Sequence, residues 1–136
     1  AWLLKLHGEM FGDVWEWAGD TKKQNTQIGI DKHQVQEELR KLEMDIREWP
    51  RHFEALECAV RLHHRAVQIH PFKNGNGRWA RLLANIWLKQ NDHPLTEWPS
   101  IVGESPVREE YLAAVRAADN LDFEPLLELH RRYTGF

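Results

Sequence analysis

The sequence predicts an all-α domain of about six helices with one short β-like excursion. Its 136 residues are a common size for a single domain with one hydrophobic core. Apolar residues recur at steps of three and four along most of the chain, which is the period of amphipathic helices. No internal repeat, low-complexity tract or domain boundary is visible, so we expect residues 1–136 to form one domain.

The first helix is expected over residues 2–17, with Gly19 as its C-terminal break. Its apolar face would consist of Leu3, Leu6, Met10, Val14 and Trp17. Residues 21–32 differ, because Ile28 and Ile30 alternate around Gly29 among polar side chains. This pattern predicts a short β-hairpin whose edge could pair with a peptide, although a plain loop between two helices fits the same residues.

The later helices follow from the same spacing and from prolines that end or begin them. Helical periodicity covers residues 35–46 and 53–67, which end before Pro50 and Pro71 respectively. A further helix covers residues 79–87, and residues 91–105 form a connector. The last two helices are expected over residues 106–115, with Pro106 in the first turn, and over residues 123–133.

Composition and charge exclude several functional classes. The chain has 18 Lys and Arg against 21 Asp and Glu, a formal net charge of −3, which disfavours nucleic acid as a partner. No apolar run approaches the roughly 20 residues of a spanning helix, so no membrane association is expected. The single cysteine, Cys58, allows no internal disulfide, and the absence of a secretion signal favours a cytoplasmic location.

The residues that indicate chemistry run from His70 to Arg81. Gly75 and Gly77 flank Asn76 and allow backbone angles that turn several N–H groups inward, immediately before a helix N-terminus. Such an arrangement is typical of a phosphate site. Arg78 and Arg81 are three residues apart on that helix, so both guanidinium groups can face the same anion.

His70 precedes Pro71 at the end of the preceding helix, where its imidazole would lie over the anion site and could accept a proton from an attacking hydroxyl. We expect the other histidines to be surface or internally satisfied polar residues: His7, His33, His52, His93 and His130. A zinc site at His63, His64 and His70 is not expected, because neighbouring helical histidines diverge. The glycine pattern also matches a dinucleotide fingerprint formally, but no βαβ unit surrounds it.

The loop resembles the signature of Fic domain proteins (the Fic/Doc superfamily), HPFx(D/E)GNGRxxR. The matching residues are His70, Pro71, Phe72, Gly75, Asn76, Gly77, Arg78 and Arg81. The segment from Phe11 to Gly19 is similar to the family's upstream Trp-Ala-Gly segment, and residues 21–32 fall where the family has its target-docking flap. Within the family, the chain looks most similar to the bacterial branch labelled mobile mystery protein B.

The resemblance implies a Fic fold and transfer of AMP from ATP, with Mg²⁺, to a Ser, Thr or Tyr hydroxyl of a target protein. It implies that His70 is the general base and that Phe72 anchors the loop. The implied phosphate-binding residues are Gly75, Asn76 and Gly77 as an anion hole, Arg78 near the β-phosphate and Arg81 near the γ-phosphate. The flap implied to dock the target comprises Thr26, Gln27, Ile28 and Gly29.

One residue departs from the family pattern. Asn74 stands where the family has an acidic residue that binds Mg²⁺, and an amide oxygen can ligate the ion but adds no charge. We therefore expect metal affinity to depend on the ATP phosphates. Two alternatives remain: a Doc-like kinase that transfers the γ-phosphate, and a non-catalytic module that binds a nucleotide or peptide.

Many Fic proteins are restrained by a glutamate on an (S/T)xxxE(G/N) helix, which pairs with the second arginine of the signature. The spacing from Ser100 to Glu104 and from Ser105 to Glu109 fits, but neither copy is followed by Gly or Asn. The restraint would then lie upstream of Ala1, where we expect further residues, or on a separate antitoxin-like partner, or be lacking altogether.

Overall fold

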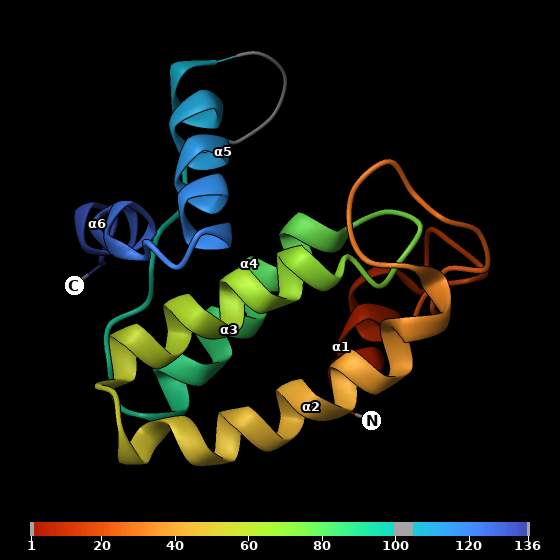
Figure 1. Cartoon of the computed structure of the whole chain (residues 1–136), viewed down its shortest axis with the longest axis horizontal. Helices are drawn as coiled ribbons and strands as arrows, with labels where there is room; N and C mark the ends of the chain where they lie inside the picture. The colour runs from red at the N-terminus through yellow and green to blue at the C-terminus, as the bar shows by residue number, and fades with distance from the viewer. Residues whose placement is uncertain (1, 100–104, 136) are drawn as a thin grey trace.

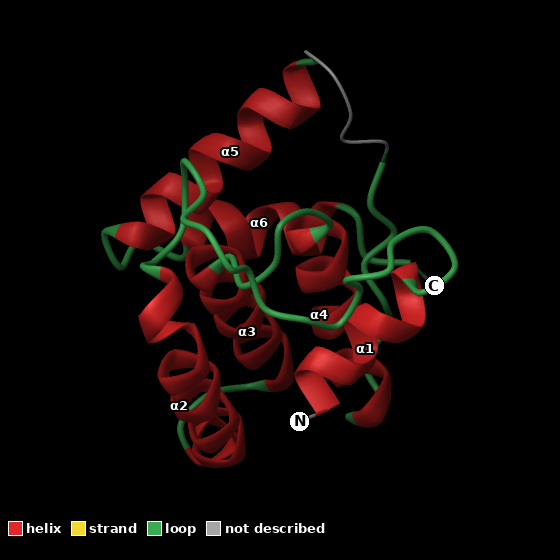
Figure 2. Cartoon of the chain, turned by 90° about the vertical axis from the view of Figure 1, so that its right-hand side faces the viewer, coloured by secondary structure: helices red, strands yellow, loops and turns green. Residues whose placement is uncertain are grey.

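The computed structural model describes residues 2–99 and 105–135, and in this part of the chain it contains six α-helices and two short 3₁₀ helices. The expected all-α fold is therefore confirmed, and no strand is drawn for the described residues (Figure 2). The α-helices are α1 (Trp2–Phe11), α2 (Val35–Glu48), α3 (Ala55–Ile69), α4 (Asn76–Gln90), α5 (Pro106–Asp119) and α6 (Glu124–Arg132). The 3₁₀ helices are η1 (Lys32–Gln34) and η2 (Trp49–Arg51).

The helices α3 and α4 form the centre of the molecule and pack against each other along their lengths (Figure 1). Helix α2 covers one side of α3, while α1 packs against α4. Helices α5 and α6 pack on each other and on α3. The loop that joins α3 to α4 lies beside the loop that follows α1, at the right of Figure 1.

Two clusters of apolar side chains hold this arrangement together. The larger lies among α1, α2, α3 and α4 and includes the fully buried Phe72 and Trp79. The indole N–H of Trp79 also donates to the carbonyl of Leu3 at 2.9 Å, which ties α4 to α1. The smaller cluster joins α3 to α5 and α6 through Val60, Tyr111, Ala114, Leu126 and Leu129. The loop before α4 is thus anchored in the larger cluster by Phe72.

The first helix is shorter than predicted and ends at Phe11. The N–H groups of Val14 and Trp15 both donate to the carbonyl of Phe11 at 2.9 Å, so the chain turns there, and Val14 is 69% exposed. Beyond the turn, the rings of Trp15 and Trp17 stack with their centroids 4.7 Å apart. Residues 12–17 are therefore not helical, although their apolar residues have helical spacing. The side chains of Trp15 and Trp17 stack on each other there.

The predicted β-hairpin over residues 21–32 is wrong. Side chains satisfy part of its backbone: Asn25 Oδ1 accepts from the N–H of Lys32 at 2.8 Å, and the Thr26 hydroxyl donates to the carbonyl of Ile28 at 2.6 Å. The N–H groups of Lys22 and Ile30 instead donate to the carbonyls of Pro71 and Ile69. Asn and Thr side chains compete with sheet pairing in this way. The segment from Asp20 to Asp31, here called the flap loop, is therefore an irregular loop.

The connector before α5 is described only in part. Ser100 to Glu104, one of the two stretches with the spacing of a restraining motif, lies outside the described residues. Ser105 in the second stretch caps α5 instead, because its hydroxyl oxygen accepts from the N–H of Arg108 at 3.1 Å.

Candidate active site

The predicted catalytic, phosphate-binding and metal-binding residues line one hollow of about 340 Å³ between the α3–α4 loop and α5. His70, Arg78 and Arg81 all line it, although they come from the end of α3 and the first two turns of α4. The hollow is also lined by Asn74, Gly75, Asn76 and Gly77 from the loop, Ile28 from the flap loop, and Arg108, Tyr111 and Leu112 from α5. Of the four predicted flap residues, only Ile28 reaches this hollow.

The side chain of Asn76 fixes the shape of the loop. Its Oδ1 accepts from the N–H of Phe72 and its Nδ2 donates to the carbonyl of Phe72, both at 2.9 Å. Gly75 precedes the helix in a left-handed conformation with φ of 78°, which favours glycine. The amide side chain of Asn76 is therefore a structural clamp, and only its backbone N–H is available to a ligand.

The first turn of α4 supplies the backbone donors. The N–H groups of Asn76, Gly77 and Arg78 precede the first intrahelical bond, which Trp79 donates to the carbonyl of Gly75 at 3.0 Å. The N–H of Gly75 differs from expectation, because it already donates to Asn74 Oδ1 at 2.7 Å. The helix dipole adds positive potential at the same point. This terminus can therefore hold an anion through the amides of residues 76–78.

The two arginines face the hollow without an acidic partner among the described residues. The guanidinium of Arg78 lies 4.6 Å from the ring centroid of Phe11, and that of Arg81 lies 5.5 Å from the ring centroid of Tyr111. Gly77 leaves room for Arg81, since a Cβ on Gly77 would lie 3.2 Å from Arg81 Nη1. Both positive charges are therefore available to a phosphate chain.

His70 is held in place by the flap loop. The N–H of Lys22 donates to the carbonyl of Pro71 at 2.8 Å, and a Cβ on Gly29 would lie 2.4 Å from Cβ of His70. His70 itself has φ of 49°, an unusual value for a residue with a side chain. Burial, together with the nearby charge of Lys22, lowers the pKa of His70 to about 4. The imidazole is consequently neutral near pH 7, and its ring nitrogens have no hydrogen-bond partner in the described chain.

His7 is expected from the sequence to be an ordinary surface or satisfied residue, and the structure gives it a more specific place. Its Nδ1 accepts from the N–H of Gly19 at 3.0 Å, so the proton lies on Nε2, which donates to the carbonyl of Asn74 at 3.0 Å. The ring stacks on Phe72 with a centroid separation of 3.6 Å. His7 thereby holds the glycine loop from beneath. Local sequence pattern could not reveal this contact, which spans 67 positions.

We expect His7→Phe to lower the free energy of unfolding by about 2–5 kcal/mol. The phenyl ring keeps the stacking on Phe72 but leaves the N–H of Gly19 and the carbonyl of Asn74 without partners. Urea denaturation followed by circular dichroism measures the change. The exposed His52 gives the control, and His52→Phe should change stability by less than about 0.5 kcal/mol. Equal stabilities of the two variants would contradict this role of His7.

The described residues contain no group of three or more His, Cys, Asp or Glu side chains placed to hold a metal ion. His63 is bonded to Tyr111 and His130, and His64 to Asp119 at 2.8 Å, so both are committed elsewhere. Asn74 offers one amide oxygen to the hollow, and this oxygen already accepts a hydrogen bond. Among the described residues that line the hollow, Asn74 is therefore the candidate contact for a divalent ion.

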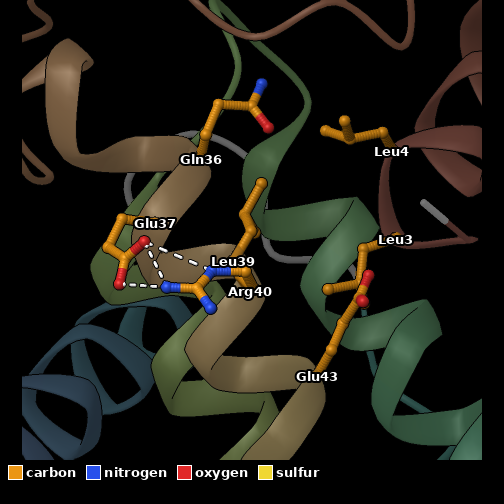
Figure 3. Close-up of a pocket in the computed structure, with 7 residues that line it drawn as sticks. All are labelled: Leu3, Leu4, Gln36, Glu37, Leu39, Arg40 and Glu43. Carbon is orange, nitrogen blue, oxygen red and sulfur yellow. Dashed lines mark hydrogen bonds and ion pairs between the residues drawn. The ribbon is translucent and has the colours of Figure 1, made fainter.

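Another hollow, of about 320 Å³, lies between α1 and α2 (Figure 3). Leu3, Leu4 and Leu39 form its apolar part. The guanidinium of Arg40 is engaged by Glu37, with Nη2 2.6 Å from Oε1, as the dashed lines in Figure 3 show. Since its arginine is already paired within one helix, this surface lacks the available positive charge of the glycine-loop hollow.

Residues 1–88 match the model of the Fic/DOC family. The sequence is 29% identical over 139 residues to a protein adenylyltransferase Fic of Nematostella vectensis, covering 97% of this chain and 31% of that protein. It is 28% identical over 136 residues to the protein adenylyltransferase fic-1 of Caenorhabditis elegans, covering 92% of this chain and 25% of that protein. The chain thus spans less than a third of these relatives. They do not support the expected bacterial branch labelled mobile mystery protein B.

Solved structures show the same fold. A fragment of Fic-1 from C. elegans superimposes with a TM-score of 0.76 at 27% identity, over 96% of this chain and 39% of that chain. The BepC protein of Bartonella tribocorum, solved with bound AMPPNP, gives a TM-score of 0.73 at 20% identity, over 99% of this chain and 73% of that chain.

None of the helices in the described part of this chain has the length and apolar character needed to cross a bilayer.

Proposed function

The chain belongs to the Fic/DOC family, and from this premise we propose that it transfers AMP from ATP to a hydroxyl side chain of a target protein. The observation that supports this best is the hollow itself. It combines a neutral histidine with a helix N-terminus and two arginines that have no acidic partner in the described chain. Attack at phosphorus requires a base, positioning and charge neutralisation, and these groups supply all three. Residues 1–136 would act as one catalytic domain.

In the proposed reaction, His70 accepts the proton of the target hydroxyl. The hydroxyl oxygen forms a bond to the α-phosphorus of ATP, and the bond from that phosphorus to the bridging oxygen breaks, so pyrophosphate leaves. The amides of residues 76–78 hold phosphate oxygens, and Arg78 and Arg81 offset the charge that gathers on the leaving group.

Mg²⁺ enters this proposal as part of the substrate, bound to the phosphates of ATP. Asn74 is the chain's candidate contact to the ion, through an oxygen that also accepts from the N–H of Gly75. A carboxylate at position 74 would bind the ion more strongly than the amide, because it adds a second oxygen and a negative charge and Mg²⁺ prefers carboxylate ligands.

We therefore expect Asn74→Asp to raise the transfer rate at low Mg²⁺ by about tenfold, the gain from one charged ligand. One carboxylate oxygen can keep the hydrogen bond from Gly75 while the other faces the ion. Initial rates measured over a Mg²⁺ titration at constant ATP give the result. Asn91→Asp, at the exposed end of α4, is the matched control and should leave the titration unchanged. An identical Mg²⁺ dependence of wild type and Asn74→Asp would remove position 74 from the metal contact.

The state of His70 gives a prediction for pH. Its pKa of about 4 lies below the ordinary 6.5, so the base stays neutral and the rate at saturating substrates should be flat from about pH 8 to pH 5. Because the unfolded chain binds the proton more readily, stability falls as the pH drops from 6.5 towards 4, and folding must be checked by circular dichroism at each pH. An inflection of the rate near pH 6.5 in folded protein would contradict the lowered pKa.

The target is proposed to dock along the flap loop at Thr26, Gln27, Ile28 and Gly29. Ile28 is 62% exposed and lines the hollow, so a target segment lying on it would place a side chain near His70. An antitoxin-like protein that restrains the enzyme would act most directly by placing an acidic side chain on Arg81. If an acidic side chain paired with Arg81, this arginine could no longer bind the phosphates. His70 would be unaffected, but the affinity for the nucleotide would fall.

One experiment tests the transfer reaction. The chain is incubated with cell lysate and ATP labelled at either the α- or the γ-phosphate, and labelled proteins are separated by electrophoresis. Label from the α-position alone is expected. Label from the γ-position alone would instead indicate a kinase, and no label from either position would indicate a binding module or a restrained enzyme.

A further inference from the structure

A chain of buried polar side chains runs from the hollow into the interior behind Arg81. The hydroxyl of Tyr111 lies 2.8 Å from Nε2 of His63, and Nδ1 of His63 lies 2.9 Å from Nε2 of His130. Nδ1 of His130 in turn lies 2.9 Å from the hydroxyl of Thr96. These four residues are at most 5% exposed, although they come from α3, α5, α6 and the segment after α4. A continuous buried network of this kind fixes the positions of its side chains, and the loss of one member leaves a buried polar group without a partner, which lowers stability.

The direction of the hydrogen bonds follows from Arg81. The guanidinium of Arg81 lies 5.5 Å from the ring centroid of Tyr111, and its charge favours the ionised hydroxyl and so opposes the burial that raises the pKa of Tyr111. A guanidinium can only donate, so in any hydrogen bond between the two side chains the Tyr111 oxygen is the acceptor. The single proton of that hydroxyl is then free to point inward, to Nε2 of His63. In that arrangement, His63 carries its own proton on Nδ1 and donates it to His130.

His130 completes this arrangement. If its Nε2 accepts from His63, His130 also carries its proton on Nδ1 and donates to the hydroxyl oxygen of Thr96. Both imidazoles are neutral in this arrangement, and burial lowers the pKa of each. Two contacting rings that are both buried could not carry positive charge together.

On the basis of the proposed nucleotide transfer, we infer that Tyr111 is a positioning residue that holds Arg81 toward the phosphates, with its hydroxyl oriented as an acceptor by His63 and His130. On its other side, Arg81 lies beside Gly77, which leaves space for the guanidinium because a Cβ at that position would be only 3.2 Å from Nη1. A long, flexible arginine would otherwise lose much freedom on binding an anion. The network orders it in advance.

The test uses Tyr111→Phe, which keeps the ring over Arg81 and removes only the hydroxyl. The dissociation constant for ATP, measured by calorimetry, should rise about fivefold to tenfold, the effect of one hydrogen bond. The chain's second tyrosine supplies the matched control. Tyr133 also lies near an arginine, with the guanidinium of Arg132 5.9 Å from its ring centroid, and it does not line the hollow. Tyr133→Phe should therefore leave ATP binding unchanged.

The imidazole tautomers provide an independent readout that needs neither a variant nor catalysis. Nitrogen-15 NMR of the wild-type protein should show protons on Nδ1 of both His63 and His130, the less common tautomer. In Tyr111→Phe, His63 loses its donor at Nε2, and its tautomer signature should change.

Protons on Nε2 in the wild-type protein, or equal ATP affinity of wild type and Tyr111→Phe, would overturn the inference. If the protein bound ATP but transferred no nucleotide, the proposed function would be wrong. The ATP affinities and the histidine tautomers would still test the role of Tyr111, because neither depends on transfer.

Discussion

Replacement of His70 by alanine is expected to reduce nucleotide transfer by about 10²- to 10⁴-fold, the usual contribution of a general base. The imidazole lines the hollow, is neutral near pH 7, and has no hydrogen-bond partner in the described chain that would compete for a proton. Binding of ATP should change little, because a base acts in the transition state more than in the ground state. Transfer of α-label to a target and calorimetric titration with ATP measure the two quantities separately.

Two comparisons make this expectation specific. His52→Ala removes an exposed imidazole that contacts Glu48 and should retain the wild-type rate. His70 also takes part in the packing of the flap loop, since Gly29 lies directly on its Cβ, so thermal unfolding of His70→Ala must be compared with the wild type. Transfer at the native rate by folded His70→Ala would remove His70 from the role of base.

The second large effect is expected at Gly75, where alanine should lower the free energy of unfolding by about 2–5 kcal/mol and abolish ATP binding. Its φ of 78° is strained for any residue with a side chain. The added Cβ would also lie 2.7 Å from Cε2 of Phe11 and 3.2 Å from Cζ3 of Trp15. The loop must move to relieve these contacts, and the amides at the start of α4 move with it. Urea denaturation and ATP titration measure both losses.

Gly8→Ala is the matched control, because here the same substitution should raise the free energy of unfolding. Gly8 lies inside α1, and a Cβ there would meet its nearest atom at 3.7 Å, an ordinary contact. Alanine is the better helix former, so a gain of about 0.5–1 kcal/mol is expected. If Gly75→Ala were as stable as Gly8→Ala, the contact of the loop with Phe11 would not constrain the site.

The sequence predicted those features of this protein that depend on residues close together in the chain. Six helices follow from the spacing of apolar residues, and a helix after the glycine loop was expected, although α4 begins at Asn76 and not at residue 79. Arg78 and Arg81 lie on one side of α4 because they are three residues apart. The position of His70 at a helix end follows from Pro71. These features depend on dihedral preferences and helix geometry, which short stretches of sequence determine.

The flap loop and the end of α1 show where local reasoning was insufficient. Alternation around Gly29 resembled a hairpin, but Asn25 and Thr26 bond the backbone themselves. The helical period of residues 12–17 was overridden by a turn on the carbonyl of Phe11, after which the rings of Trp15 and Trp17 stack on each other. In both segments, contacts outside the periodic pattern decided the conformation.

Local sequence was therefore enough to specify the helices, the glycine turn and which residues could carry the chemistry. Only the packing of the helices placed His7 on the carbonyl of Asn74 and brought Tyr111 to Arg81 and His63. Those partners lie tens of residues apart, and whether a buried polar group is satisfied depends on which atoms the packed helices bring within hydrogen-bond distance.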